Sequence, residues 1–281
     1  MSDHHETSGD RPDRDDTFRR QIRDAYAAAA AVWQAGASVV YGQLAAALVR
    51  EGVAAQWPGL DRGPVLDLCA GTGAVSAAFD LSATQVIAAD LAVEMLRVNV
   101  ERRPPAVVCQ ATALAFRSRC FAAVLVAFGL NHATDPVAVL VEAGRVTAPG
   151  GTIGASTFAD GWNHPAKAAV DDVLVRYGFE PPSWHVRLKH EVEPTTSTRS
   201  ALVTLAGRAG LRYPTVRFMP VSLSLTALEV VGWRFSMASH AAFVSSLPVS
   251  ERAEATEAAV AEVDRRWEPV VAPMHVLRAQ A

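Results

Sequence analysis

The sequence has few cysteines, no long apolar run and no excess of basic charge. Its three cysteines form no C-x-x-C pair and have no metal-ligand spacing, which favours a reducing, cytoplasmic compartment and predicts no metal site. No stretch of 18 or more apolar residues is present, so we expect no membrane-spanning helix and no membrane partner. The net charge of −3 excludes a generally basic nucleic-acid-binding protein, and we expect no nucleic-acid partner.

The beginning of the chain differs in composition from the rest. Residues 1–16 carry six acidic side chains and no apolar periodicity, so we predict a disordered tail there and no secretory signal. Half of all 281 residues are apolar and a fifth are charged, which suits a folded protein with a sizeable core. We expect residues 17–281 to form a single domain.

Short apolar runs alternate with helical stretches through residues 62–158. The apolar runs are residues 65–68, 86–89, 106–109, 122–128 and 152–158, and the helical stretches between them are 74–79, 92–100 and 137–146. Strands that alternate with helices of this length indicate βαβ units. The pattern therefore predicts an α/β fold with a Rossmann-like, mostly parallel sheet covered by helices on both faces. Segments 198–219 and 268–278 supply the remaining elements of a seven-stranded sheet.

Three helical segments lie outside this alternation. They are residues 17–60, 159–197 and 226–266. The first has apolar residues at three- and four-residue steps, which is typical of amphipathic helices. We expect these segments to form a cap over the carboxyl ends of the strands, where α/β sheets of this kind bind their ligands.

The segment 65–76, VLDLCAGTGAVS, is the most informative part of the chain. A predicted strand leads through Asp67 into a turn containing Gly71 and Gly73, where a helix begins. The glycines let backbone N–H groups approach a ligand closely. Asp90 closes the next predicted strand, 23 residues after Asp67, a spacing at which an acid binds ribose hydroxyls.

Two ligands compete for such a loop. A dinucleotide brings a pyrophosphate, which a carboxylate at position 67 would repel. S-adenosylmethionine brings an ammonium, which the same carboxylate would attract. Ser76 stands at the third glycine position of the dinucleotide pattern, which also counts against a dinucleotide. A third interpretation is that this strand, loop and helix have a structural role and bind no ligand.

Several segments together resemble class I S-adenosylmethionine-dependent methyltransferases, in particular the ubiquinone/menaquinone-biosynthesis-like and natural-product enzymes. Residues 67–73 resemble the D/E-x-G-x-G-x-G motif, with Cys69 at the first glycine, and "AADLAVEML" (88–96) resembles the second motif. "CQATALAF" (109–116), "VAFGLNHATDP" (126–136) and "GRVTAPGGTIGAS" (144–156) resemble later family segments. The resemblance covers roughly residues 62–158.

The resemblance implies S-adenosyl-L-methionine as the cofactor and a set of residues that contact it. These are Asp67, Cys69, Gly71, Thr72, Gly73, Asp90, Leu91, Gln110, Ala111 and Phe128. Two positions depart from the family. Gln110 replaces an aspartate that accepts a hydrogen bond from the adenine amine, and its amide oxygen can still accept that bond. Ala122 stands where an acid is usual, and we have no account of this change.

Candidates for catalysis and acceptor binding follow the predicted strand ends or lie on the first helices. We expect His132 to act as a general base, because an unperturbed imidazole pKa near 6.5 suits proton transfer at neutral pH. Asp160 is the candidate to orient it, and His164 is an alternative base. The candidates for acceptor contacts are Tyr26, Trp33, Asn131 and Trp162. For each of these candidate residues the competing interpretation is an ordinary packing role. For His132 it is also a cap of the following helix.

Apolar helices over a cofactor site suggest a small, largely apolar acceptor enclosed from water. The sequence therefore predicts a small-molecule methyltransferase for O- or C-methylation, in specialised metabolism. A cyclase or other non-methylating enzyme on the same fold is the main alternative, because fold does not fix function. A non-catalytic binding subunit and a nicotinamide-dependent oxidoreductase are further alternatives, and homodimerisation is left open.

Overall fold

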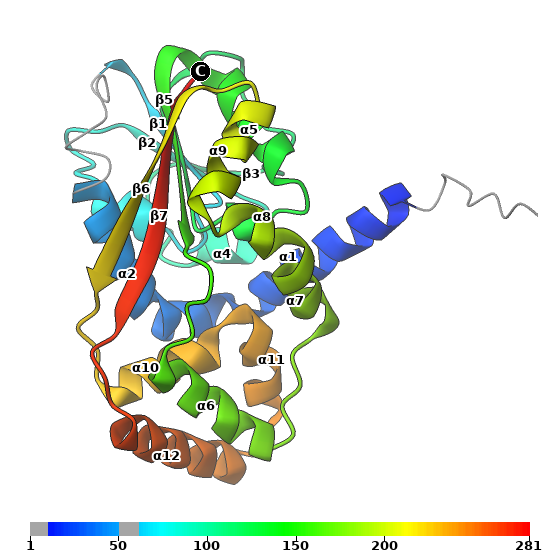
Figure 1. The fold of residues 1–281 in the computed structure, drawn as a ribbon, viewed down its shortest axis with the longest axis vertical. Helices are drawn as coiled ribbons and strands as arrows, with labels where there is room; N and C mark the ends of the chain where they lie inside the picture. The colour runs from blue at the N-terminus through cyan, green and yellow to red at the C-terminus, as the bar shows by residue number, and fades with distance from the viewer. Residues whose placement is uncertain (1–10, 51–61) are drawn as a thin grey trace, which may run out of the picture.

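The computed structural model describes residues 11–50 and 62–281 of the chain, with side chains from residue 15 onward. One seven-stranded sheet has the order β3-β2-β1-β4-β5-β7-β6 (Figure 1). Strands β1 to β5 pair in parallel, and β7 lies antiparallel to both of its neighbours, β5 and β6. The predicted fold class, α/β with a mostly parallel seven-stranded sheet, is confirmed.

The strands lie close to the predicted apolar runs. They are β1 (Val65–Leu68), β2 (Val86–Asp90), β3 (Ala106–Val108), β4 (Phe121–Ala127), β5 (Thr147–Phe158), β6 (Arg212–Ser222) and β7 (Val271–Gln280). The last three are longer than the sequence predicts. Strand β5 begins at Thr147, ahead of Gly150 and Gly151, because its register with β4 shifts between Phe121 and Ala123. The turn signal at Pro149 and Gly150 hid this extension.

Alternate strand residues divide the core between the two faces of the sheet. On one face, Val65 of β1 and Leu125 of β4 pack with helices α2, α3 and α10. On the other face, Leu66 and Val124 pack with α5 and α9. Successive side chains of a strand point to opposite faces, so near-continuous apolar strands supply both halves of the core.

The helices of the sheet region are short and follow their strands. They are α3 (Ala74–Ala78), α4 (Val93–Arg97), the 3₁₀ turn η3 (Leu130–His132), α5 (Pro136–Val146) and α9 (Arg199–Arg208). Asp135 caps α5 by accepting from the Ala138 N–H at 2.9 Å, and Pro136 occupies the first helical turn, where its missing N–H costs nothing. The cap therefore fixes where the chain turns after η3.

The remaining helices lie beside the sheet or beyond one end of it (Figure 1). They are α1 (Arg11–Ala35), α2 (Ala37–Ala47), α6 (Pro165–Arg176), α7 (Ser183–Arg187), the π-helical turn η4 (Leu188–Val192), α8 (Glu193–Thr196), α10 (Ala227–Ser236), α11 (Ala238–Ser246) and α12 (Val249–Arg265). We call α1, α6, α7, α10 and α11 the cap. Its helices come from the three segments that the sequence predicted to cover the strand ends.

Two predicted boundaries differ from the structure. Helix α1 begins at Arg11, so residues 11–16 of the predicted tail are helical, while residues 1–10 of that prediction lie outside the described residues. The predicted helical segment 226–266 is broken at Met237, whose extended backbone (φ −59°, ψ 140°) separates α10 from α11.

The junction of α1 and α2 is a close helix contact. A Cβ at Gly36 would lie 2.3 Å from the carbonyl oxygen of Gly232 in α10 and 2.5 Å from the Ser236 hydroxyl. Only glycine allows this approach. The contact brings the junction of the first two helices against the backbone of α10.

No single helix among the described residues is long and apolar enough to cross a membrane. One bent pair, Asp15–Ala35 with Ala37–Arg50, meets the length and composition test at a bend of 82°.

Candidate active site

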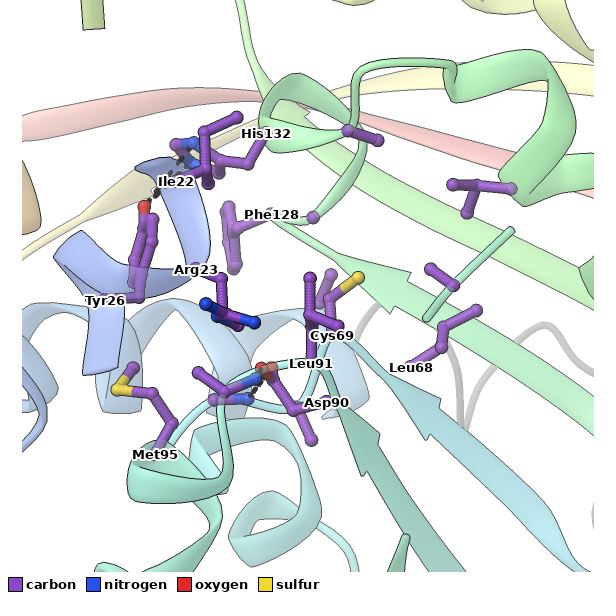
Figure 2. A pocket seen from close by; sticks show the side chains of 18 of the residues that line it. Ile22, Arg23, Tyr26, Leu68, Cys69, Asp90, Leu91, Met95, Phe128 and His132 are labelled. Atoms are coloured by element: carbon purple, nitrogen blue, oxygen red, sulfur yellow. Dashed lines mark hydrogen bonds between the residues drawn. The ribbon is translucent and has the colours of Figure 1, made fainter. Parts of the chain in front are cut away.

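A cavity of about 190 Å³ lies where the loops after β1, β2 and β4 meet helix α1. Figure 2 shows the cavity between Asp90 and Cys69 on the sheet side and Tyr26 on the helix side. Nine of the ten predicted cofactor residues line it; they are Asp67, Cys69, Gly71, Thr72, Asp90, Leu91, Gln110, Ala111 and Phe128. The tenth, Gly73, has a left-handed backbone (φ 92°) and caps α3, so it shapes the turn.

Asp67 is a buried acid at the end of β1. Its side chain is 1% exposed, and its Oδ2 accepts from both the Ser76 N–H at 3.0 Å and the Ser76 hydroxyl at 2.6 Å. Ser76 thus braces the acid from the position where dinucleotide-binding loops have glycine. No described residue bonds the other oxygen, Oδ1. Burial raises the pKa of Asp67 to about 6, although the two bonds from Ser76 act in the opposite direction.

Asp90 joins the loop after β2 to the loop after β1. Its Oδ2 accepts from the Gly71 N–H at 2.8 Å, and its Oδ1 accepts from the Ala92 N–H at 2.9 Å. Burial nevertheless raises its pKa above the ordinary range. Each carboxylate oxygen has a second lone pair, so the side chain retains the capacity to accept from a ligand hydroxyl.

The loops after the neighbouring strands β1 and β4 each contain a residue with a left-handed backbone conformation. Cys69 (φ 61°) and Phe128 (φ 55°) are both left-handed, a conformation that costs a non-glycine residue free energy and that concentrates at functional sites. A Cβ at Gly129 would lie 2.6 Å from the Cys69 Cβ and 2.9 Å from its Sγ. Gly129 therefore lets the two loops touch. The left-handed φ of Cys69 also explains why the resembling motif has glycine at that position.

Gln110 contacts helix α1. With the amide oxygen turned toward Arg19, it lies 3.2 Å from both Nε and Nη1 of that guanidinium and 2.6 Å from the Thr112 hydroxyl. Arg19 and Arg23 both line the cavity, and Figure 2 shows Arg23 between Phe128 and Asp90. The predicted adenine-facing amide is thus already engaged by a cation of α1.

His132 and Tyr26 form a pair across the cavity, from η3 and α1. The Tyr26 hydroxyl lies 3.2 Å from Nε2 and 3.4 Å from Nδ1 of His132, and the Asn131 amide nitrogen lies 3.1 Å from Nε2. Burial and the charge of Lys189 lower the pKa of His132 to about 4. Burial raises the pKa of Tyr26 well above its usual value of 10. At neutral pH the imidazole is therefore uncharged and the phenol is protonated.

An aromatic wall continues from this pair. Tyr26, Trp33 and Tyr41 line the cavity in sequence, with ring centroids 5.4 Å and 5.1 Å apart. Tyr41 meets Phe128 edge-on at 5.3 Å. Edge-on and tilted pairs of this kind are favourable ring geometries, and they leave an apolar wall against which water is excluded.

Four of the predicted catalytic and acceptor residues are not part of the cavity lining. The amide nitrogen of Asn131 lies 3.1 Å from Nε2 of His132, and Trp162 packs against Phe158 at a centroid distance of 4.7 Å. His164 caps α6, because its Nδ1 accepts from the Ala166 N–H at 3.2 Å, and its role as an alternative base stays a prediction. The side chain of Asp160 is exposed and acts electrostatically on His275.

The described hydrogen-bond partners of His132 are Tyr26 and Asn131. The pairing of His132 with Asp160 stays a prediction. The lining residues that sequence reasoning missed include Arg19, Arg23, Tyr41 and Met95. The helical spacing of residues 19, 23 and 26 on one face of α1 is a signal that could have found the two arginines.

Comparison with known proteins identifies the central segment. Residues 66–154 match the model of a family described as a methyltransferase domain. This segment is therefore similar to a methyltransferase domain. The chain is similar to demethylmenaquinone methyltransferase of Renibacterium salmoninarum, with 36% identity over 114 residues, covering 40% of this chain and 48% of that protein. The same enzyme of Mycolicibacterium paratuberculosis is 38% identical over 112 residues, covering 40% of this chain and 49% of that protein.

The chain spans about half the length of these curated relatives. A solved structure extends the likeness in fold beyond the methyltransferase domain. A protein described as a methyltransferase from an antibiotic biosynthesis pathway of Anabaena variabilis is 16% identical, with a TM-score of 0.57, covering 85% of this chain and 96% of that one. The methyltransferase domain thus lies within a fold that both chains share over most of their length.

S-adenosylmethionine is the methyl donor of this methyltransferase family, and the residues of the cavity fit it. The free Oδ1 of Asp67 and the raised pKa of that acid suit an ammonium, which stabilises the ionised carboxylate. Asp90 can accept from ribose hydroxyls. Gly71 lines the cavity with a positive φ of 56°, a conformation that other residues rarely adopt, and without a Cβ its backbone can approach a ligand closely.

Proposed function

We propose that this protein is an S-adenosylmethionine-dependent methyltransferase that methylates oxygen or carbon of a small, largely apolar molecule in specialised metabolism. The observation that carries the proposal is the unpaired oxygen of buried Asp67, which lies at the end of β1 in a cavity walled by aromatic rings. A phosphorylated ligand would meet a negative charge there, whereas the cationic amino-acid part of S-adenosylmethionine meets an attractive one.

The cavity residues divide into a cofactor side and an acceptor side. Asp67, Asp90 and the backbone of Gly71 are the candidates to bind the cofactor, which supplies a methyl group on a positively charged sulfur. Phe128 and the Tyr26–His132 pair face them from the other side. The protein's work in such a displacement is to hold the accepting atom about 3–3.5 Å from the methyl carbon, on the line of the breaking bond, and to exclude water.

His132 is the candidate to receive a proton from a hydroxyl acceptor. Its pKa of about 4 keeps the imidazole unprotonated at neutral pH, so a lone pair is available. The same low pKa limits its driving force as a base, and the Tyr26 hydroxyl beside it remains a hydrogen-bond donor. We infer that the pair orients the acceptor's hydroxyl and takes its proton as the methyl group moves.

The direct test uses S-adenosylmethionine labelled in its methyl group. The purified protein is incubated with small aromatic and aliphatic acceptors, and both label transfer and S-adenosylhomocysteine are followed. We expect both products to form in equal amounts with at least one apolar acceptor, and calorimetry to detect binding of S-adenosylhomocysteine. Binding without transfer to any acceptor would favour a non-methylating enzyme, and tight uptake of a nicotinamide dinucleotide instead would overturn the proposal.

A further inference from the structure

A series of partly exposed side chains leads from the cofactor cavity into the cap. Phe128 lines the cavity, Phe158 stacks on it at 5.2 Å, and Trp162 stacks on Phe158 at 4.7 Å. We call these three rings the aromatic track. All three retain partial solvent exposure, as does Lys167 beyond them. One ring, Phe158, therefore separates the cavity wall from Trp162 and its polar neighbours.

Lys167 of α6 stands at the far end of the aromatic track. Its Nζ donates to the carbonyl oxygen of Trp162 at 3.0 Å and lies 4.0 Å above the Trp162 ring. Among the described residues no carboxylate lies within ion-pair distance of it. An ammonium has three donors and no acceptor, and a cation enclosed without a counter-ion is costly. Lys167 is thus a positive charge that lacks an anionic partner.

Two indole groups beside Lys167 also lack acceptors. Trp233 of α10 stacks on Trp162 at 5.9 Å, and the buried Nε1 atoms of both rings have no hydrogen-bond partner among the described residues. Buried indole N–H groups usually find one. The far end of the track therefore carries two buried indole N–H groups without acceptors and an ammonium whose one described hydrogen bond goes to a carbonyl oxygen.

The charged side chains around Lys167 form ion pairs with one another. Arg234 donates to both oxygens of Asp171 at 2.8 Å, and Lys189 pairs with Glu193 at 2.5 Å. Burial and the charges of Arg234 and Lys189 lower the pKa of Lys167 to about 7. The carboxylates of Asp171 and Glu193 act in the opposite direction, and their effects are weaker. The region has one uncompensated positive charge.

We propose that Lys167, with the indole N–H groups of Trp162 and Trp233, binds a carboxylate of the methyl acceptor, whose apolar body lies along the aromatic track. The proposal rests on the proposed function and narrows its acceptor class to apolar carboxylic acids. A carboxylate matches the site because it brings one negative charge and several acceptor lone pairs. A phosphate monoester would bring close to two negative charges, and the single cation Lys167 would leave one of them uncompensated.

The test compares three probes by calorimetry on protein saturated with S-adenosylhomocysteine. They are trans-cinnamate, its neutral amide trans-cinnamamide, and phenyl phosphate. We expect trans-cinnamate to bind about tenfold more tightly than the amide, as a charge-assisted hydrogen bond provides, and more tightly than phenyl phosphate. The preference for the acid over the amide weakens as pH rises above about 7, because Lys167 loses its proton there.

Matched variants assign the preference to one side chain. Lys167→Met keeps the apolar stem and removes the charge, so its acid and amide affinities should agree within about threefold. Lys189→Met removes a lysine already paired with Glu193, and it also removes a charge that lowers the pKa of Lys167. At pH 6, where Lys167 is largely protonated in either protein, this variant should retain the wild-type preference. Thermal unfolding and amide affinity report whether either variant has lost its fold.

Three results would overturn the proposal. They are equal binding of cinnamate and its amide by the wild type, an unchanged preference in Lys167→Met, and tighter binding of phenyl phosphate than of cinnamate. If wild-type protein does not bind S-adenosylhomocysteine, it is the proposed function that fails. The probe comparison can then be repeated without that ligand, so the two failures are distinguishable.

Discussion

The cofactor half of the site and the cap half are built in different ways. Asp67, Asp90 and Gly71 lie within 23 positions of one another, and backbone N–H groups fix both acids. The cap half depends on side chains from elements far apart in the sequence, as the Tyr26–His132 pair shows, whose members are 106 positions apart. Local hydrogen bonding dictates the first half and tertiary packing the second. Substitutions should therefore separate cofactor affinity from acceptor chemistry.

The largest expected effect is the loss of cofactor affinity in Asp67→Asn. The amide can still accept from Ser76 but has no charge for the ligand's ammonium, and an uncompensated buried charge costs about 3 kcal/mol or more, which is over 100-fold in Kd. Calorimetry with S-adenosylhomocysteine measures it. Asp80→Asn, at an exposed acid paired with Ser82, is the control. A change below threefold in Asp67→Asn would contradict the assigned role.

Loss of turnover in His132→Gln is the next largest effect. We expect about a 100-fold decrease for a hydroxyl acceptor, with cofactor affinity changed by less than about twofold, because His132 lies on the acceptor side. His164→Gln is the matched control, since His164 caps α6 and its replacement should leave turnover within about threefold. Steady-state rates of both variants with labelled donor decide the point. Unchanged turnover in His132→Gln would remove it from the chemistry.

Cofactor affinity should depend on pH through Asp67. Its pKa is about 6, and a cationic ligand binds the ionised form, so affinity is full above this pH and is lost as pH falls through it. We expect about a tenfold weaker Kd per pH unit below 6. Calorimetry between pH 5 and 8 measures the slope. Asp67→Asn should remove the dependence, and a slope that survives in this variant would point to another group, such as Asp90.

The contact between the loops after β1 and β4 can be broken without touching a polar group. Gly129→Ala places a methyl group 2.6 Å from the Cys69 Cβ, and we expect a loss of about 1–3 kcal/mol in the free energy of unfolding. Gly42→Ala, in α2, meets nothing within 4 Å and should instead stabilise by about 0.5–1 kcal/mol. Urea unfolding compares them. Equal stability of the two variants would show that the loops separate readily.

The smallest effect concerns the adenine side. Gln110→Asp introduces a charge 3.2 Å from the Arg19 guanidinium and restores the acid of the resembling motif. We expect cofactor binding to tighten by about threefold, in keeping with a partly exposed charge pair. Gln110→Ala, measured by the same calorimetry, should weaken it by a similar factor. A weaker Kd in Gln110→Asp would mean that Arg19 takes the new carboxylate away from the ligand.

The sequence predicted the sheet and the cofactor side well, because both are local. Five apolar runs located β1 to β5, segments 198–219 and 268–278 located β6 and β7, and the loop motif located nine residues of the cavity lining. The sequence could not place Asp160 and His164 relative to the cavity, whose lining contains neither, because a position after a strand does not fix which way a side chain faces. It also could not predict the pKa of His132, which depends on burial by α1 and on Lys189 of η4, elements that meet only in the folded chain.

The contact at Gly36 fixes the carboxyl end of α1 against Gly232 of α10. The same helix carries Arg19 to Gln110 and Tyr26 to His132, so one helix position sets both contacts. A side chain larger than glycine at position 36 would displace α1 from α10 and thereby alter the cofactor side and the acceptor side of the cavity together.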